Sequence, residues 1–502
     1  MPTKITLMKR TGKRLAIFLR ANAVWIGLAA AIVVGSFMRF YNLGAKSLYA
    51  DEALYWQRAV THAAGGHFDV VTDIHVYFYL LSQIVQVSAS EFSLRLVSAL
   101  PGVAAIPLFY LVLRKFMGST GALVGTGLYA VSPFLIVVAQ TVREHTLYLF
   151  FVISLIYFFL NYLTETRTWD LIAFAVLSVL AIFTHISAAW VILALGFTYL
   201  WIFIFYKDRR DRKQFIGFAS YAVFIVLVVV GFWVLGYSSR AGWESESYLE
   251  HGHYWAGTIP SFFNLVFGNL WNLLVGAVSE QTVALAILAI LLAISYGLLK
   301  GGRKSETIFL VATFPLLITI GTSLVRLYPF IGAHRNNIYL VLGVYLLAGL
   351  GFEIMAKINK TIFGFALALM LVFLTYDAWG KVNQPSLQEL RPIAETLCEE
   401  IESGDQIFAV SASSYAFDYY WPQCASPLAR GSQAIPVVYF GLNATGALGE
   451  LVQFGDHRAW MVLSFLNNNE LNRILQSVEG MFGEPAALVQ EENGAWLYLL
   501  PN

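Results

Sequence analysis

Long runs of apolar residues with almost no charge inside them constrain this chain more than any other feature. Two clear examples are AVWIGLAAAIVVGSFM, beginning at Ala23, and LAILAILLAI, beginning at Leu285. In lipid, a helix of this length satisfies all of its own backbone hydrogen bonds. Only 13% of the residues are charged, about half the share of roughly a quarter that is usual for soluble proteins. The chain is therefore predicted to be a polytopic α-helical membrane protein.

About eleven spanning helices are expected. The first follows a basic amino-terminal stretch, and no small-residue cleavage site follows it, so we interpret it as a span rather than a signal peptide. The spans are expected near residues 17–38, 92–113, 119–140, 145–163, 169–184, 187–206, 215–236, 283–299, 306–326, 335–356 and 361–378.

The basic residues between these spans predict the topology. With the amino terminus in the cytoplasm, every cytoplasmic connection is basic, most clearly KDRRDRK at 207–213. The apolar segment 75–89 is short, and a crossing there would place KDRRDRK outside, so we expect an interfacial helix. The predicted transmembrane domain, 1–378, then has two long outer loops, 39–91 and 237–282.

The tail, residues 379–502, has a different pattern. A helical stretch (LQELRPIAETLCEEIES) precedes short strand-like runs (DQIFAV, AWMVLSF and AWLYLLP). This predicts a small soluble α/β domain outside the cytoplasm. The two cysteines, Cys398 and Cys424, lie there and are expected to form a disulfide, with two buried thiols as the alternative.

An acidic pair, Asp51 and Glu52, lies in the first outer loop soon after the first span, with Tyr55 close by. Asp73 and His75 come later in the same loop. Taken alone, this is as consistent with a solvated acidic turn as with a site.

Cations at the outer ends of other spans change that balance. Positive residues are disfavoured there, yet Arg143, His185, Arg326, His334 and Arg335 all occupy such positions. Arginine binds phosphate through a bidentate fork, although one such residue alone is more often a lipid anchor. Together with the acidic pair, they indicate a site for an anionic phosphate beside a carboxylate base.

This pairing suits transfer of a sugar from a lipid phosphate to a hydroxyl. The departing phosphate is a weak base that needs cations rather than a proton donor. The attacking hydroxyl needs one carboxylate to take its proton. No nucleotide-binding loop is required, and none occurs in the sequence.

Several motifs occur in a characteristic order across the membrane region: RFYNLGAKSLYADEALY, DIHVYFYLLSQ, SEFSLRLVSALPGVAAIPLFYLVLRKFMG, SPFLIVVAQTVREHTLYL and FTHIS. In this order and spacing the chain resembles the GT-C superfamily of polyprenyl-phosphate-sugar-dependent glycosyltransferases. It is most similar to the protein O-mannosyltransferases and to the lipid A aminoarabinose and galacturonic acid transferases.

The resemblance implies a role for each matching residue. Asp51 would be the catalytic carboxylate, and Glu52 would order the loop or contact the acceptor. Arg143 and Arg335 would bind the donor phosphate. Arg326 and His334 are added as candidates for the same role because of their predicted outer positions. Further candidates for contacts with the acceptor, the sugar or an ion are Tyr55, Asp73, His75, His145 and His185.

The resemblance also implies the partners and the location. The donor would be a polyprenyl-phosphate sugar, and the acceptor a lipid, a polysaccharide or a protein on the extracytoplasmic face. Direct displacement with one carboxylate as the base predicts inversion at C1. The expected location is a bacterial inner or plasma membrane. No nucleic acid is expected as a partner.

The chain departs from the family pattern at the donor pocket. Val76 and Tyr77 replace two prolines, His145 replaces a tyrosine, and Asn336 replaces another. These changes leave the identity of the sugar open.

Three other functions remain as alternatives. A transporter or flippase of a lipid-linked sugar or other anionic lipid is the principal one, although such proteins usually carry ionisable residues near the midplane. A metalloenzyme would use Asp51, Glu52, Asp73 and His75, a set suited to Mg or Mn. A binding or scaffold protein without activity is the third.

Overall fold

The computed structural model describes residues 4–66, 75–206, 211–234, 251–300, 303–332, 334–424, 435–441 and 458–501. The chain divides into two compact units. The membrane unit comprises Met1–Tyr41, Phe68–Tyr77 and Val97–Val382, and the loop–sheet unit comprises Asn42–His67, Phe78–Leu96 and Asn383–Asn502. The soluble tail thus shares a unit with two parts of the first loop, a grouping that the sequence-based boundary at 378/379 did not anticipate.

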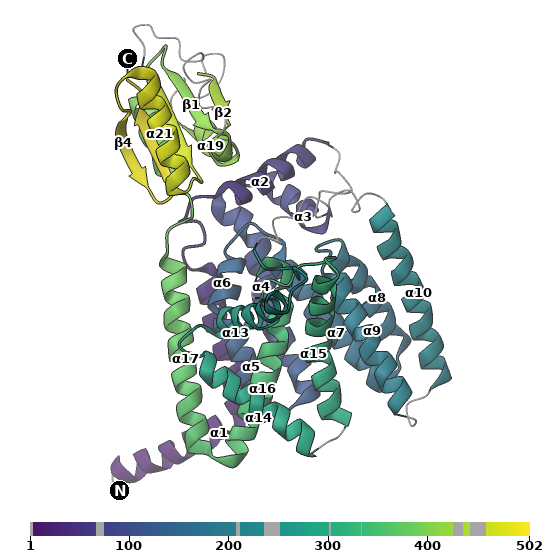
Figure 1. Ribbon diagram of the computed structural model, residues 1–502. Coiled ribbons are helices and arrows are strands. Elements are labelled where there is room, and N and C mark those ends of the chain that lie inside the picture. The colour runs from purple at the N-terminus through teal and green to yellow at the C-terminus, as the bar shows by residue number, and fades with distance from the viewer. Residues whose placement is uncertain are drawn as a thin grey trace. The chain divides into compact units, whose positions relative to one another are not determined.

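The membrane unit contains helices joined by turns and no strand among its described residues (Figure 1). Its helices are α1 (Lys4–Phe40), α4 (Glu91–Phe116, shared with the loop–sheet unit), α5 (Ser119–Val131), α6 (Pro133–Ala139), α7 (His145–Glu165), α8 (Thr168–Ile182), α9 (Ala188–Phe205), α10 (Arg212–Val234), α12 (Ile259–Phe263), η3 (Asn264–Gly268), α13 (Asn269–Val278), α14 (Val283–Lys300), α15 (Arg303–Leu324), η4 (Arg335–Asn337), α16 (Leu340–Ile358) and α17 (Lys360–Asn383).

Nine helices within the described ranges are long and apolar enough to cross a membrane, or ten if α5 and α6, bent by 53°, form one broken span. The bend follows from Pro133, which begins α6 and has no N–H to continue the helix of α5. The fold confirms an integral, polytopic α-helical membrane protein.

The candidate spans differ from the expected eleven at three places. The helices Thr168–Ile182 and Val283–Gly297 occupy predicted spans but are shorter than eighteen residues. Conversely, Ile259–Val278 lies in the predicted outer loop 237–282 yet is apolar enough to qualify. Figure 1 shows its last part, α13, lying across the direction of α16 and α17 rather than along it. Hydropathy alone does not distinguish such a transverse helix from a span.

Close backbone packing brings α5 against α16. A Cβ on Gly349 would lie 2.7 Å from the Gly121 carbonyl oxygen, closer than Cβ atoms ordinarily come. Small residues that let backbones approach are a common device of helix packing in membranes. Helix α16 also contacts α13, α14 and α15, so it forms the centre of the unit.

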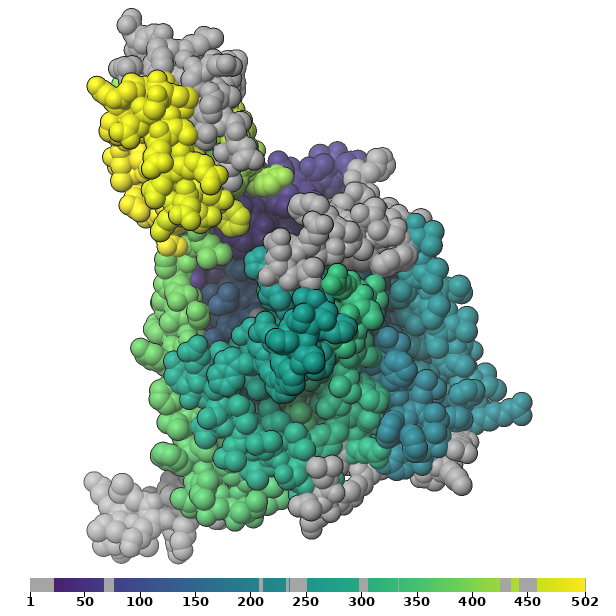
Figure 2. Space-filling view, in the orientation of Figure 1, coloured from purple at the N-terminus to yellow at the C-terminus, as the bar shows by residue number. Residues whose placement is uncertain are grey.

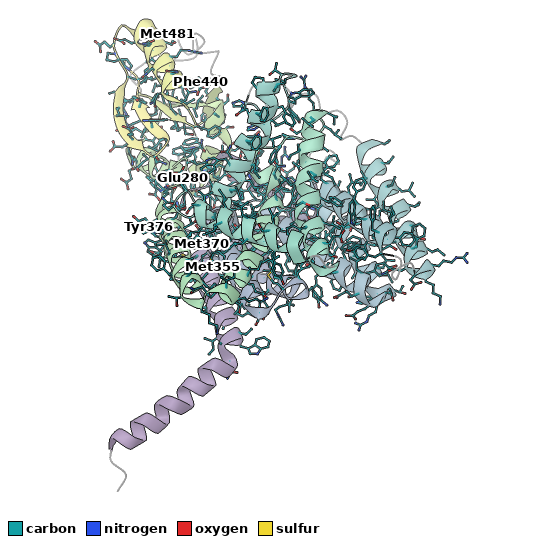
Figure 3. All side chains as sticks on the ribbon, turned by 60° about the horizontal axis from the view of Figure 1, so that its bottom comes forward. Glu280, Met355, Met370, Tyr376, Phe440 and Met481 are labelled. Carbon is teal, nitrogen blue, oxygen red and sulfur yellow. A yellow bond between two sulfur atoms is a disulfide. The ribbon has the colours of Figure 1, made fainter. Side chains whose placement is uncertain are left out.

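Helix α17 shows how the outer helices divide between protein and lipid. Met370 is fully buried, whereas Tyr376 on the same helix is 76% exposed (Figure 3). Near its end, Ala378 and Val382 pack with Met38 of α1 and Ile136 of α6. The exposed apolar face is suited to contact lipid.

The loop–sheet unit contains one mixed five-stranded sheet with the order β2-β1-β3-β5-β4. Its elements are α2 (Ala50–Ala63), α3 (His75–Val85, shared with the membrane unit), α18 (Leu390–Glu400), β1 (Gln406–Val410), η5 (Ser411–Ser413), α19 (Ser414–Tyr420), η6 (Trp421–Gln423), β2 (Val437–Phe440), β3 (Ala459–Ser464), α21 (Asn468–Phe482), β4 (Ala487–Glu492) and β5 (Ala495–Leu499).

Parallel and antiparallel pairings meet in this sheet. Strand β1 pairs in parallel with β2 and β3, whereas β5 pairs antiparallel with β3 and β4. All six residues of the central strand β3 are buried, as expected where both faces are covered. The predicted small α/β domain is confirmed, with α18, β1, β3 and β5 at the predicted runs.

One face of the sheet packs against α21 (Figure 1). Alternate residues such as Phe408, Met461 and Trp496 point to this core, which Phe440 and Met481 also join (Figure 3). In the space-filling view, the last part of the chain, in yellow, covers this side of the sheet domain (Figure 2).

Helix α3 has eleven residues, about 16 Å in length. That is too short to cross a hydrocarbon core of about 30 Å. The prediction that 75–89 does not span is therefore supported, while its location at a membrane surface stays a prediction.

Candidate functional site

The acidic pair lies in the first turn of α2. Tyr49, the residue before α2, has an extended backbone, and its N–H donates to Glu52 Oε2 at 3.4 Å. Carboxylates are favoured at this end of a helix because the unpaired N–H groups there carry partial positive charge. The local sequence therefore begins the helix so that Asp51 and Glu52 occupy adjacent positions in its first turn.

Glu52 is committed to a buried ion pair within the loop–sheet unit. Its two carboxylate oxygens accept hydrogen bonds from Arg95 Nε at 3.0 Å and Arg95 Nη2 at 2.8 Å. The Glu52 and Arg95 side chains are 1% and 3% exposed. This arrangement agrees with the expected role of Glu52 in ordering the loop.

Arg95 was not singled out by the sequence reasoning. Besides pairing with Glu52, it donates to the carbonyl oxygens of Leu43 and Lys46, each at 2.9 Å, and of Ser47 at 3.1 Å. The guanidinium thereby holds the turn that leads into α2. The available signal was a lone arginine within the apolar run SLRLVSAL.

Asp51 is half-buried, whereas its neighbour Glu52 is buried. Tyr55, one turn further along α2, is buried, and its ring packs against Phe78 at 4.9 Å between centroids. Asp73 lies outside the described residues, and only the backbone of His75 is described, as the first residue of α3. The predicted four-residue ion site thus stays a prediction, with Glu52 already bound to Arg95.

The second group of predicted residues gathers within the membrane unit. Arg143 precedes α7, whose first residue is His145, while His185 lies in the turn between α8 and α9 and Arg335 begins η4. Ser98 of α4 fixes the backbone at Arg143, since its hydroxyl donates to the Arg143 carbonyl oxygen at 2.8 Å.

Three side chains form the buried centre of this cluster. Ligand atoms of Glu144, His145 and His185 all lie within 4.8 Å of one another. The His145 ring is 4% exposed, its Nδ1 lies 3.4 Å from Glu144 Oε1, and neither ring nitrogen has a hydrogen-bond partner among the described residues. Buried polar atoms are usually paired, so such an imidazole is suited to meet a ligand.

Both predicted phosphate ligands, Arg143 and Arg335, lie within electrostatic range of His145. The guanidiniums of Arg143 and Arg335 both interact with His145. The pKa of His185 is lowered, mainly by burial and also by the Arg335 guanidinium. The Glu144 carboxylate opposes this shift only in part. Arg143 is half-buried and Arg335 is exposed. The structure thus places His145 and His185 5.7 Å apart between ring centroids, with Arg143 and Arg335 within electrostatic range of His145.

His334 adjoins the same cluster, whereas Arg326 has another partner. Burial, together with the charge of the neighbouring Arg335 guanidinium, lowers the pKa of the His334 imidazole to about 4. Arg326 is exposed, has a left-handed backbone with φ of 57°, and donates from Nε and Nη2 to the Trp255 carbonyl oxygen at 3.3 Å each. Its expected part in phosphate binding stays a prediction.

Glu144, His145 and His185 are the described residues that could hold a metal ion. Two imidazoles and one carboxylate form a donor set typical of zinc, whereas magnesium and manganese prefer oxygen ligands. The neighbouring guanidiniums oppose a dication and favour an anion. The set thus fits Mg or Mn poorly.

The structure thus contains a helical bundle with candidate spans, a helix with an acidic first turn and a cluster of histidines near two arginines. The resemblance to the GT-C superfamily led us to expect these features. Known proteins were compared with this chain by sequence and by fold.

Residues 75–233 match the family model described as dolichyl-phosphate-mannose-protein mannosyltransferase. The fold is similar to that of ArnT from Cupriavidus metallidurans bound to undecaprenyl phosphate, with a TM-score of 0.57 and 14% identity over 96% of this chain and 98% of that chain. These matches confirm the resemblance to the GT-C superfamily.

The fold is also similar to that of the archaeal oligosaccharyltransferase AglB from Archaeoglobus fulgidus. Its complex with an inhibitory peptide and a dolichol-phosphate gives a TM-score of 0.56 and 12% identity over 96% of this chain and 75% of that chain. In the apo form the TM-score is 0.53 at 13% identity over 80% of this chain, which spans 64% of that enzyme's length. No curated protein matches the chain by sequence.

Proposed function

We propose that the protein transfers a sugar from a polyprenyl-phosphate donor to a hydroxyl acceptor on the extracytoplasmic face of the membrane. The observation that carries this proposal is a buried His145 whose ring nitrogens have no hydrogen-bond partner among the described residues, within electrostatic range of both Arg143 and Arg335. Such a cluster suits a phosphate bound beside a polar sugar. ArnT bound to undecaprenyl phosphate and AglB in complex with dolichol-phosphate support the donor class.

In the proposed reaction, Arg143 and Arg335 bind the donor phosphate. The acceptor oxygen attacks C1 of the sugar, the bond from C1 to the phosphate oxygen breaks, and the acceptor proton passes to the Asp51 carboxylate. The electron pair of the broken bond leaves with polyprenyl phosphate, whose charge the two guanidiniums stabilise. Displacement in one step inverts C1, so a product with the donor's configuration would contradict it.

The test is donor turnover by the purified full-length chain in detergent with a panel of polyprenyl-phosphate sugars. Release of free polyprenyl phosphate in the presence of an acceptor would identify the donor. If no donor is turned over and labelled lipid instead moves between leaflets in vesicles, the chain is a transporter or flippase.

The guanidiniums can supply the charge that the phosphate needs, so we expect turnover to persist in a chelator. Zinc is included among the metals tested because a structure of the Archaeoglobus fulgidus oligosaccharyltransferase in complex with Zn and sulfate has a similar fold, with a TM-score of 0.55. Loss of turnover reversed by Mg or Mn would indicate a carboxylate site that includes Asp51. Loss reversed only by Zn would indicate the group Glu144, His145 and His185.

Replacing Arg335 by Gln is expected to raise the KM for the donor. A hydrogen bond to a charged group contributes about 1.5–3 kcal/mol, which corresponds to a rise of roughly 10- to 100-fold. Arg335→Lys should recover part of this loss, because it keeps the charge but not the bidentate fork. Arg326→Gln serves as the comparison, because that guanidinium is engaged with Trp255. Equal effects of the two Gln variants would contradict a special role for Arg335.

The low pKa of His334 predicts that stability falls as the pH drops. In the folded chain this pKa is about 4, against roughly 6.5 when unfolded. Between these values the unfolded chain binds more protons, so the free energy of unfolding decreases as pH falls through this window. His334 also accepts the Asn336 N–H, which requires the neutral ring.

His334→Asn provides the matched variant, because its side-chain oxygen can accept the same N–H and does not titrate. The apparent Tm in detergent should fall less between pH 7 and pH 5 in this variant than in the wild type. Equal decreases would show that His334 does not carry the effect.

A further inference from the structure

The first turn of α2 receives hydrogen-bond acceptors from the far end of the chain. A helix begins with N–H groups that have no partner in the helix itself, and the N-cap residue Tyr49 supplies no side-chain cap. The Ala50 N–H donates to Gln388 Oε1 at 2.6 Å, and the Leu48 N–H donates to Tyr420 Oη at 2.6 Å. Asp51 directly follows Ala50, and Leu48 lies just before the N-cap residue Tyr49.

Two further residues of the tail hold the turn that precedes α2. Glu389 Oε2 accepts the Ser47 hydroxyl at 2.6 Å. Arg391 forms an ion pair with Glu91 and donates to the Gly44 carbonyl oxygen at 3.4 Å. The tail thus forms hydrogen bonds to the same turn, residues 43–47, that Arg95 also binds.

The tail residues belong to two arms. The first arm is the segment 386–391, which leads into α18 and is buried at Gln388. The second arm is the end of α19, where the Tyr419 hydroxyl donates to the Ala89 carbonyl oxygen at 2.6 Å and its ring meets the Trp56 ring edge-on at 4.9 Å. Both arms contact the first loop within one unit.

The disulfide joins these two arms. Cys398 lies in α18, and Cys424 follows η6, which continues from α19; their Cα atoms are 5.8 Å apart. The bridge therefore ties the helix after Gln388 to the segment after Tyr420. Without it, the two arms would be connected only through the intervening chain and their own packing.

We propose that the C-terminal domain is a disulfide-linked clamp that positions Asp51 through the first turn of α2. The inference rests on the proposed role of Asp51 as the base. A general base must lie within hydrogen-bond reach of the proton that it takes. Buried N–H groups left without acceptors are unfavourable, so loss of the clamp would loosen the turn that carries Asp51.

The central test removes both acceptors with little change in shape, in the double variant Gln388→Met and Tyr420→Phe of the full chain. We expect kcat to fall by roughly 10- to 100-fold, since small misplacements of a catalytic group have effects of that size. The donor KM should change little, because the proposed phosphate ligands, Arg143 and Arg335, belong to the membrane unit and are not altered. Hydrogen–deuterium exchange of a peptide covering residues 44–60 should become faster.

Conservative rescue separates positioning from a general loss of stability. Gln388→Glu keeps an acceptor for the Ala50 N–H, so it should retain more kcat than Gln388→Met. Asn467→Ala is the control in the same domain. It removes the N-cap of α21, and the described hydrogen bonds of the Asn467 side chain are to N–H groups of that helix. It should leave both kcat and exchange of 44–60 as in the wild type.

The double variant Cys398→Ser and Cys424→Ser tests the link between the arms. It should lower kcat and accelerate exchange of 44–60, and reducing agent should reproduce this in the wild type but not in the variant. Unchanged kcat and exchange in both double variants, with Asp51→Asn inactive, would overturn the clamp alone. A fully active Asp51→Asn would instead overturn the proposed function, whatever the exchange data show.

Discussion

Replacing Asp51 by Asn is expected to slow sugar transfer strongly while donor binding persists. Asparagine has nearly the same shape but cannot take the proton of the attacking hydroxyl. General base catalysis typically contributes about 10²- to 10⁴-fold, so kcat should fall by that amount. The half-buried position of Asp51 in the first turn of α2 makes the substitution sterically mild.

The measurement is release of polyprenyl phosphate, together with donor affinity measured by direct binding. Glu479→Gln provides the matched control, because it neutralises an exposed carboxylate on α21. Donor affinity of Asp51→Asn should stay within a few-fold of the wild type. Wild-type turnover in Asp51→Asn would exclude this carboxylate as the base.

Replacing Arg95 by Met is expected to have the largest effect on stability. It leaves the Glu52 carboxylate buried at 1% exposure without its bidentate partner. Breaking a buried ion pair in this way typically costs about 3–5 kcal/mol. The turn 43–47 also loses three hydrogen bonds to its carbonyl oxygens.

Unfolding in detergent by heat or denaturant measures this effect. Arg95→Lys should be destabilised as well, since it keeps the charge but not the fork. The double variant Arg95→Met and Glu52→Met should recover part of the lost stability, because no buried charge is left unpaired. An Arg95→Met variant as stable as the wild type would show that the pair contributes little.

Much of the fold follows from local patterns that are visible in the sequence. The apolar runs predicted membrane helices, and the strands β1, β3 and β5 formed at DQIFAV, AWMVLSF and AWLYLLP. These features were predictable because burial in lipid or in a sheet imposes a periodicity on neighbouring residues. The helix α13 was not predicted, because 237–282 was interpreted as an outer loop although Ile259–Val278 has the hydropathy of a span.

The candidate site was predictable in its charges but not in its contacts. The sequence predicted Arg143 and Arg335 from their disfavoured positions, and Asp51 and Glu52 from their place after the first span. It did not indicate that Glu52 is paired with Arg95, or that Glu144 joins His145 and His185. These partners come from separate helices and turns, and no local pattern connects them.

The sequence by itself determined that this is a membrane protein with a small α/β tail, and which charged residues flank its predicted spans. Only the tertiary structure showed that Glu52 is held in a buried ion pair, and that Glu144 lies beside His145 and His185. Glu52 meets Arg95 across 43 residues, and Ala50 meets Gln388 across 338. Contacts at such separations depend on how whole elements pack, because residues this far apart have no geometric relation until the chain has folded.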